Sequence, residues 1–174
     1  SIAAAIPSNV QAIAVLTGVP SWVSKQSNQI NGNPRSTFVQ LWVKKVATRY
    51  KNNKSIVGYQ IWNEPNMVSN PDNTTLDLVA KPANYIAMLA EARAAINSAA
   101  PGKLVINGAT TAINQNYPRT LYYNKSLLDG GVLNYVDVFA AHFYGKQIEN
   151  VLRPKGVKDF IKKVTKLIWF TESG

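Results

Sequence analysis

The sequence predicts an α/β fold in which parallel strands are covered by helices. Short apolar runs rich in branched residues recur at regular intervals, and segments with helical periodicity separate them. The five runs occupy residues 10–17, 56–62, 104–111, 136–144 and 167–171. Alternation in units of this size is typical of parallel strands joined by right-handed crossovers.

The composition is that of one globular domain. The chain has 174 residues, of which 46% are hydrophobic and 16% are charged. This length suits a single domain, and the apolar fraction is high enough to bury a core. The composition therefore excludes an intrinsically disordered chain.

Three helices are expected between the strands. The first covers 38–50, where apolar residues recur on one face, and Ser36 or Thr37 is expected to cap its start. The second covers 85–99 and ends before an Ala-Pro-Gly turn. The third covers 157–167. Helices in these positions cover a parallel sheet.

The chain is strongly basic, with a net charge of +10 and a pI near 9.8. Such a charge suggests a nucleic acid or an anionic surface as partner. However, the cations concentrate at 44–54 and 155–166, toward the ends of expected helices, where they complement the negative end of the helix dipole. Aromatic and basic residues are not interleaved, so we expect no nucleic-acid partner.

Residue counts exclude several kinds of site. The chain has no cysteine, and His142 is its only histidine, so neither a disulfide framework nor a thiolate or multi-histidine metal site is expected. No Gly-rich phosphate-binding turn follows an expected strand. We therefore expect no cofactor and no metal. No apolar stretch approaches the roughly 20 residues of a membrane span, and residues 1–7 lack the order of a signal peptide.

Two of the four glutamates, Glu64 and Glu172, lie at the carboxyl ends of expected strands. A carboxylate after an apolar strand is costly to desolvate, so it is seldom placed there without a partner or a task. The structural alternative is a helix cap or an ion pair with a lysine. Glu91 and Glu149 are expected on the surface. Paired carboxylates that face each other across a pocket are the groups that cleave glycosidic bonds.

The segment 62–66, WNEPN, resembles the signature of retaining glycoside hydrolases whose barrels carry the acid/base on strand four and the nucleophile on strand seven. It is most similar to glycoside hydrolase family 39, with family 5 second. The resemblance implies that Glu64 is the acid/base and that Asn63 hydrogen-bonds the sugar 2-hydroxyl. The segment 170–174, FTESG, resembles the nucleophile segment, which implies that role for Glu172.

Two further segments resemble the same families in the same order along the chain. The stretch 18–22, which ends in Trp22, resembles a Pro-x-Trp that follows strand three. The stretch 141–145 resembles an H-x-Y-G at the end of strand six. The resemblance implies that His142 and Tyr144 line the sugar site and that the tyrosine can steady the nucleophile.

The resemblance also implies a portion of a (β/α)8 TIM barrel that covers about strands three to seven. A complete barrel has eight strands and about 250 residues, so we expect residues 1–174 to form a single, incomplete barrel catalytic domain. Five parallel strands would leave two unpaired edges and an uncovered interior. The missing barrel segments are therefore expected from the same or another chain.

Aromatic side chains near the carboxylates are candidates for stacking on sugar rings. Trp22, Trp62 and Tyr144 lie near strand ends and are proposed for this role, with core packing as the alternative. Trp42, inside an amphipathic helix, is expected in the core. Strand alternation places Trp169 toward the helices, so core packing is favoured for it as well.

The sequence thus predicts a retaining glycoside hydrolase that cleaves a β-glycosidic bond in an oligo- or polysaccharide, with Glu64 as acid/base and Glu172 as nucleophile. A retaining mechanism needs carboxyl groups about 5 to 5.5 Å apart, and an inverting one about 6.5 to 9.5 Å. His142 is a competing general base, although a lone histidine on an apolar strand is more often a positioning residue.

Two other classes of function remain open. One is a carbohydrate-binding barrel fragment without turnover, and the other is a basic protein that binds nucleic acid or another anionic polymer. A polysaccharide substrate would favour secretion or a periplasmic location.

Overall fold

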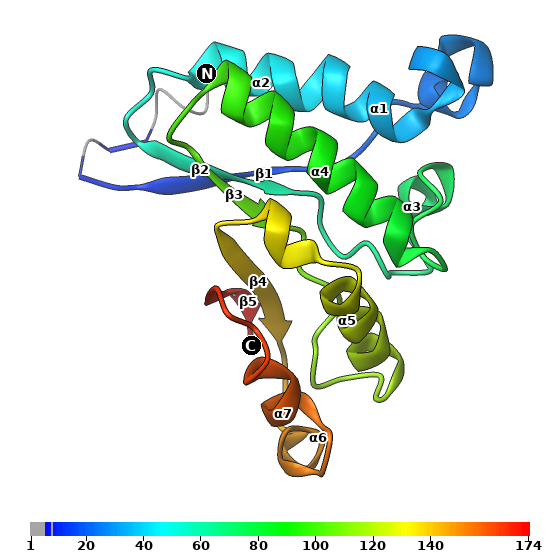
Figure 1. The fold of residues 1–174 in the computed structure, drawn as a ribbon, viewed down its shortest axis with the longest axis vertical. Helices are drawn as coiled ribbons and strands as arrows, with labels where there is room; N and C mark the ends of the chain where they lie inside the picture. Colours follow the sequence, from blue (N-terminus) through cyan, green and yellow to red (C-terminus); the bar gives the residue numbers. More distant parts are fainter. Residues whose placement is uncertain (1–5, 8) are drawn as a thin grey trace.

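A computed structural model describes residues 6, 7 and 9–174. Its centre is one sheet of five parallel strands whose order in space follows their order in the chain. The strands are β1 (Ala12–Leu16), β2 (Ile56–Ile61), β3 (Leu104–Asn107), β4 (Val138–Phe143) and β5 (Leu167–Ser173). The sheet is curled and helices cover its outer side (Figure 1). The predicted α/β fold, a portion of a TIM barrel with parallel strands and outer helices, is confirmed.

Helices fill each connection between strands. The chain from β1 to β2 contains α1 (Pro34–Phe38), a π-helical turn η5 (Val39–Val43) and α2 (Lys44–Tyr50) without a break. The later helices are α3 (Pro71–Thr75), α4 (Pro82–Ala99), α5 (Arg119–Asp129), α6 (Ile148–Leu152) and α7 (Val157–Ile161). Short 3-10 turns are η2 (Ser21–Ser24), η3 (Gln26–Asn28), η4 (Ile30–Gly32) and η6 (Val132–Tyr135). In the part of the chain that the structure describes, no helix has the length and apolar character that a membrane crossing requires.

The first helix begins earlier than predicted. Oδ1 of Asn33 accepts hydrogen bonds from the backbone N–H groups of Arg35 (3.0 Å) and Ser36 (3.3 Å), so Asn33 is the cap. Pro34 follows as the first helical residue, where the missing N–H costs nothing. The predicted caps, Ser36 and Thr37, lie inside α1.

The buried face of this helix also differs from the prediction. A π-helical turn contains more residues than an α-helical one, and it therefore rotates the residues that follow it. Val39, Val43 and Ala47 are fully buried against the sheet. Trp42 is 48% exposed, so the prediction that it packs in the core is wrong.

Helix α5 was not predicted from the sequence. Its buried face combines Leu121 and Leu127 with Thr120 and Asn124, so polar residues interrupt the apolar periodicity that identifies a helix. The amide of Asn124 donates to Oγ1 of Thr110 at 2.7 Å, which satisfies a polar group that would otherwise be costly to bury.

The main hydrophobic core lies between the helices and the outer face of the sheet. Alternate strand residues such as Tyr59, Ile61 and Phe139 point to this side and are buried. Burial of one large aliphatic side chain contributes about 1.5–3 kcal/mol. A smaller cluster on the inner face comprises Ile106, Ala109, Val138 and Ala140. Packing of the helices on the outer face of the sheet therefore stabilises the strands whose ends carry the candidate site.

A β-bulge between β4 and β5 changes which side chains face the interior. Ala141 pairs with Phe170, but the next residue, His142, pairs with Glu172. The extra residue on β5 shifts the alternation by one position. Trp169 consequently packs against the inner cluster, and the prediction that it faces the helices is wrong.

Candidate active site

Glu64, His142 and Glu172 form one cluster at the carboxyl ends of three parallel strands. Glu64 follows β2, His142 belongs to β4 and Glu172 belongs to β5. Oε1 of Glu64 lies 3.1 Å from Nδ1 of His142, which is a hydrogen-bond distance. Nε2 of His142 lies 3.4 Å from Oε1 of Glu172. This second contact is not aligned as a hydrogen bond, and Nε2 has no other partner among the described residues.

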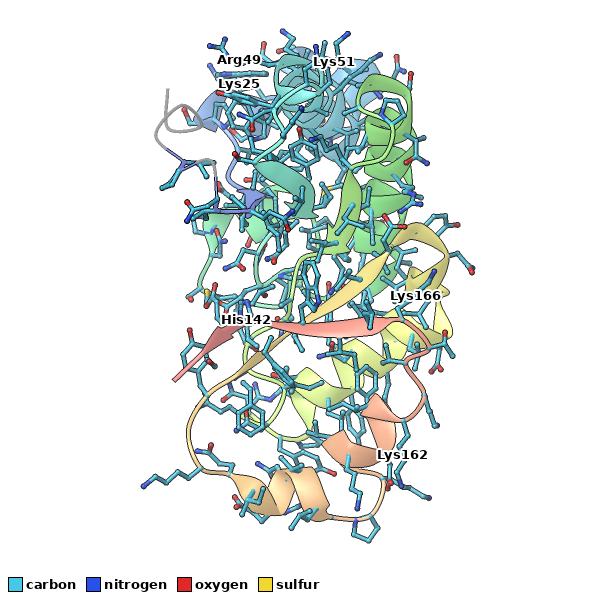
Figure 2. The ribbon with its side chains drawn as sticks, turned by 90° about the vertical axis from the view of Figure 1, so that its left-hand side faces the viewer. Lys25, Arg49, Lys51, His142, Lys162 and Lys166 are labelled. Atoms are coloured by element: carbon cyan, nitrogen blue, oxygen red, sulfur yellow. The ribbon has the colours of Figure 1, made fainter. Side chains whose placement is uncertain are left out.

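One oxygen of each carboxylate and a ring nitrogen of His142 all lie within 4.8 Å of one another. Figure 2 shows His142 beside the strand that carries Glu172. These atom types can bind Zn²⁺. The two ring nitrogens approach different carboxylates: Nδ1 is within hydrogen-bond distance of Glu64, and Nε2 lies near Glu172 without a hydrogen bond to it. Two carboxyl groups this close can flank one reacting atom, so that one gives a proton while the other attacks.

The backbone at Glu64 adopts a rare conformation. Glu64 has φ of 46° and Trp62 has φ of 76°, both in the left-handed region. Such a conformation costs a non-glycine residue about 1–3 kcal/mol and persists only where the surroundings enforce it. The N–H of Glu64 donates to the carbonyl of Ala109 at 2.8 Å, and its carbonyl accepts from the N–H of Met67 at 2.9 Å. These bonds hold the Glu64 side chain toward His142.

Asn73 organises the loop that carries Glu64. This side chain is fully buried. Its amide nitrogen donates to the carbonyls of Glu64 and Met67, both at 2.8 Å, and its oxygen accepts from the indole N–H of Trp62 at 2.6 Å. Sequence reasoning missed this residue, because an asparagine in a polar loop carries no signal of the three contacts that it makes.

The structure contradicts the prediction that Trp62 stacks on a sugar. Trp62 is fully buried, and its ring packs edge-on against Phe38 with centroids 5.1 Å apart. The left-handed backbone at Trp62 turns the side chain into the core, where Asn73 satisfies its only polar atom. Core packing, the alternative reading, is the correct one.

Tyr144 contacts the second carboxylate. Its hydroxyl donates to Oε2 of Glu172 at 3.0 Å. The buried side chain of Asn114 fixes the backbone of Tyr144, because its amide nitrogen donates to the Tyr144 carbonyl at 2.7 Å and its oxygen accepts from the Tyr144 N–H at 3.2 Å. Asn114 is a second supporting residue that sequence reasoning missed.

Two negative charges influence the Tyr144 hydroxyl. Its hydrogen bond to Glu172, followed by burial and the charges of Glu172 and Glu64, raises the pKa of Tyr144 above its ordinary value of 10.0. Tyr144 therefore keeps its proton, and its ability to donate to Glu172, across the neutral range.

Asn63 lies next to Glu64 and is half-buried. Its side-chain oxygen is 3.4 Å from the amide nitrogen of Gln60, which belongs to the inner face of β2. Gln60 is itself buried and also donates to the carbonyl of Trp62 at 3.3 Å. The Asn63 side chain is therefore held near the acid/base candidate by the strand beneath it.

Trp22 lies apart from the carboxylate cluster. It belongs to η2, which follows β1, and it is 42% exposed. With Leu41 and Trp42 it lines an apolar cavity of about 260 Å³ that neither Glu64 nor Glu172 borders. The structure therefore does not bring this predicted sugar contact to the carboxylates.

Comparison with known proteins adds sequence and fold relatives. A sequence model of the cellulase family, glycosyl hydrolase family 5, matches residues 1–166. No curated protein matches the chain significantly.

Three solved structures resemble the described fold. A psychrophilic family 10 endo-β-1,4-xylanase has a TM-score of 0.56 and 18% identity, covering 94% of this chain and 53% of the xylanase. A β-mannanase from the blue mussel Mytilus edulis has a TM-score of 0.47 and 15% identity, covering 80% and 47%. An endo-1,4-β-mannanase from Eisenia fetida has a TM-score of 0.47 and 18% identity, covering 79% and 45%. The chain thus spans about half the length of these proteins.

The likeness to the xylanase supports the partial barrel. The family match confirms the predicted clan of glycoside hydrolases, but it does not support the closer likeness to family 39. Because the match extends over nearly the whole sequence, the chain belongs to glycosyl hydrolase family 5.

Proposed function

We propose that this chain is the catalytic part of a retaining glycoside hydrolase that cleaves a β-glycosidic bond in an oligo- or polysaccharide. One observation carries the proposal: Glu64 and Glu172 contact the two ring nitrogens of one buried histidine, with carboxylate oxygens within 4.8 Å of each other. Oxygens this close let both carboxyl groups flank one anomeric carbon, which is compatible with the retaining separation of about 5 to 5.5 Å between carboxyl groups.

The proposed reaction is a double displacement. A carboxylate oxygen of Glu172 attacks the anomeric carbon while Glu64 transfers its proton to the departing glycosidic oxygen. The sugar is then esterified to Glu172. Glu64, now a carboxylate, takes a proton from water as the water oxygen attacks the anomeric carbon, which releases the sugar and restores both side chains.

Exposure supports this division of roles. The Glu64 side chain is 14% exposed and the Glu172 side chain is 40% exposed. Glu64 is the more enclosed of the two carboxyl groups, whereas the more open Glu172 accepts a hydrogen bond from the Tyr144 hydroxyl. His142 would position both carboxyl groups, and Asn63 would bind the sugar 2-hydroxyl as the family resemblance implies.

The family description makes a β-1,4-linked glucan the first substrate to test. The similar solved structures are described as mannanases and a xylanase, so β-1,4-mannan and β-1,4-xylan are the next two. Trp22 is a candidate contact for a sugar unit of a longer polysaccharide, away from the bond that is cleaved. A polymeric substrate of this kind would place the enzyme outside the cell or in the periplasm.

We further propose that additional β/α units, from the same or another polypeptide, complete the barrel around residues 1–174. Within the described residues β1 and β5 are edge strands, and Val15 and Leu167 on these strands are exposed. Apolar edges of this kind promote association. A monodisperse, monomeric and active protein with a mass near 19.1 kDa would contradict this part of the proposal.

Hydrolysis of aryl β-glycosides and of the three polymers tests the proposed function. Glu64→Gln and Glu172→Gln should each abolish turnover, whereas Glu149→Gln, on the exposed surface, should retain it. Product analysis by NMR should show retention of the anomeric configuration. Sugar binding without turnover would favour the alternative function, a carbohydrate-binding barrel fragment.

A further inference from the structure

We propose that the outward face of η5 and α2 binds an anionic polysaccharide. This basic face comprises Lys44, Lys45 and Arg49, with Gln40 and Thr48 between them. The choice of a polysaccharide among polyanions rests on the proposed glycosidase function, whereas the existence of an anion-binding face does not.

The positive charge of the chain is concentrated in its first third. Residues 1–63 contain seven lysines and arginines and no aspartate or glutamate. The remaining residues contain 12 basic and 9 acidic side chains and therefore contribute only +3 of the net charge of +10. Such an asymmetry concentrates the positive potential on one part of the molecule.

The basic face is a continuous surface. Gln40, Lys44, Lys45, Thr48 and Arg49 line a shallow groove of about 430 Å³. The three cations and Thr48 are exposed. Gln40, Lys44 and Thr48 are spaced by four residues, and so are Lys45 and Arg49. The two rows lie side by side on the helix, away from the buried stripe.

The cations of the basic face have no acidic partner in the described part of the chain. None of the ion pairs there involves Lys44, Lys45 or Arg49. Glu91 on α4 bonds instead to neutral donors, accepting from Oγ of Ser36 and Nε2 of Gln40, both at 2.7 Å. Glu91 is half-buried, so it is less exposed to solvent than the sequence predicts.

The helix dipole does not account for this charge. The sequence explanation placed the cations at a helix end, but the helical segment runs from Pro34 to Tyr50 without a break. Arg49 lies in its last turn, whereas Lys44 and Lys45 lie near its middle. The effect of the dipole on side chains falls off within the last turn. Two of the three cations are therefore unexplained by local helix stability.

The chemistry of the basic face suits a polysaccharide better than a nucleic acid. No aromatic side chain lines its groove, so it lacks a platform on which bases could stack. Helix α2 packs along α4 and cannot enter a DNA groove as a free helix would. Amide and hydroxyl groups beside cations match the hydroxyl and carboxylate groups of uronate-containing chains.

The basic face lies on the outer helical layer, away from the carboxylates. Figure 2 shows Arg49 well separated from His142, and Figure 1 shows α2 on the outside of the sheet. A polysaccharide held there would raise the local concentration of glycan near the catalytic residues without touching them.

The test measures binding in the Glu64→Gln variant, so that hydrolysis does not interfere. Affinity for polygalacturonate, for an uncharged mannan and for duplex DNA of matched charge would be measured at low and high salt. The triple change Lys44→Gln, Lys45→Gln and Arg49→Gln should weaken polygalacturonate binding by about 10-fold or more at low salt, because three ionic contacts are lost. When the same triple change is made in a chain that retains Glu64, the rate of aryl-glycoside hydrolysis should be unchanged.

A matched triple change on α7 and the residues after it, Lys158→Gln, Lys162→Gln and Lys163→Gln, removes the same charge from another exposed surface. It should alter binding less than about 2-fold, since only the overall field changes. Equal losses in both triple variants would overturn the proposal. Tighter binding to DNA than to polygalacturonate would assign the basic face to nucleic acid instead, and aryl-glycoside turnover reports separately on the proposed function.

Discussion

The Nδ1 atom of His142 lies 3.1 Å from Oε1 of Glu64, although the two residues are 78 positions apart in the chain. The same imidazole approaches Glu172 with its other nitrogen, and it is fully buried. One rigid side chain therefore lies between the two carboxyl groups, hydrogen-bonded to Glu64 and adjacent to Glu172. This relationship explains why three separate strands have to be assembled before the proposed chemistry can occur.

Replacing His142 should show whether it positions the two carboxyl groups for the reaction or has only a structural role. We expect His142→Ala to lower kcat by about 100-fold, because two carboxyl groups lose their common contact. The pH–rate profile should change shape as well, since His142 adjoins both groups that exchange protons in the proposed reaction. A variant with an unchanged profile and a uniformly lower rate would reduce His142 to a structural role.

Removing the Tyr144 hydroxyl should weaken the proposed nucleophile. Tyr144→Phe deletes the 3.0 Å hydrogen bond to Glu172, and a hydrogen bond to a charged group contributes about 1.5–3 kcal/mol. We expect kcat to fall by about 10- to 100-fold. Thermal unfolding should be nearly unaffected, and a rate equal to that of the unmodified chain would contradict the proposed role.

The Tyr144 phenol should titrate late. Because its pKa is raised above 10.0, the hydroxyl keeps its proton at pH values where an ordinary tyrosine has lost it. The difference in ultraviolet absorbance between the native chain and Tyr144→Phe should therefore show a phenolate titration whose midpoint lies above pH 10.0. A midpoint at or below that pH would show that Glu172 does not act on the hydroxyl.

Asn73 should matter to both stability and activity. Asn73→Ala removes three hydrogen bonds and leaves buried groups unpaired, each of which costs about 1–3 kcal/mol. Urea unfolding should show a free energy of unfolding lower by at least about 2 kcal/mol. Asn52→Ala, at an exposed position, is the matched control and should change little. Activity should fall further than stability alone explains, because Glu64 loses its backbone support.

The ion pair between Asp137 and Arg93 predicts an acid dependence of stability. Burial raises the pKa of Asp137, but hydrogen bonds from Arg93 at 2.6 Å and the Val105 N–H at 2.9 Å outweigh it, so the pKa lies below 3.8. Because the pKa of Asp137 is lower in the folded than in the unfolded state, its charge stabilises the fold at pH values above the unfolded-state pKa. This contribution disappears as the pH falls through the folded-state pKa. The free energy of unfolding of the native chain should exceed that of Asp137→Asn near neutral pH, and this difference should shrink as the pH drops below 3.8. A constant difference across that range would refute this assignment.

The sequence by itself determined the strands and the two acidic positions. Apolar runs identify strands because burial on both faces requires them, and Glu64 and Glu172 stood out because each follows such a run. The same patterns could not place Trp42 or Trp169. A π-helical turn in one element and a β-bulge in another shifted the faces by one residue, and neither shift has a local sequence signal.

The tertiary structure alone decided how the site is held. Asn73 and Asn114 look like ordinary loop residues in the sequence, yet each is buried and bonds to backbone groups beside a proposed functional side chain. Polar contacts between segments distant in the chain depend on how the strands pack, not on local periodicity. The periodicity of apolar residues thus determined which segments form the sheet, whereas packing decided which polar side chains meet at its end.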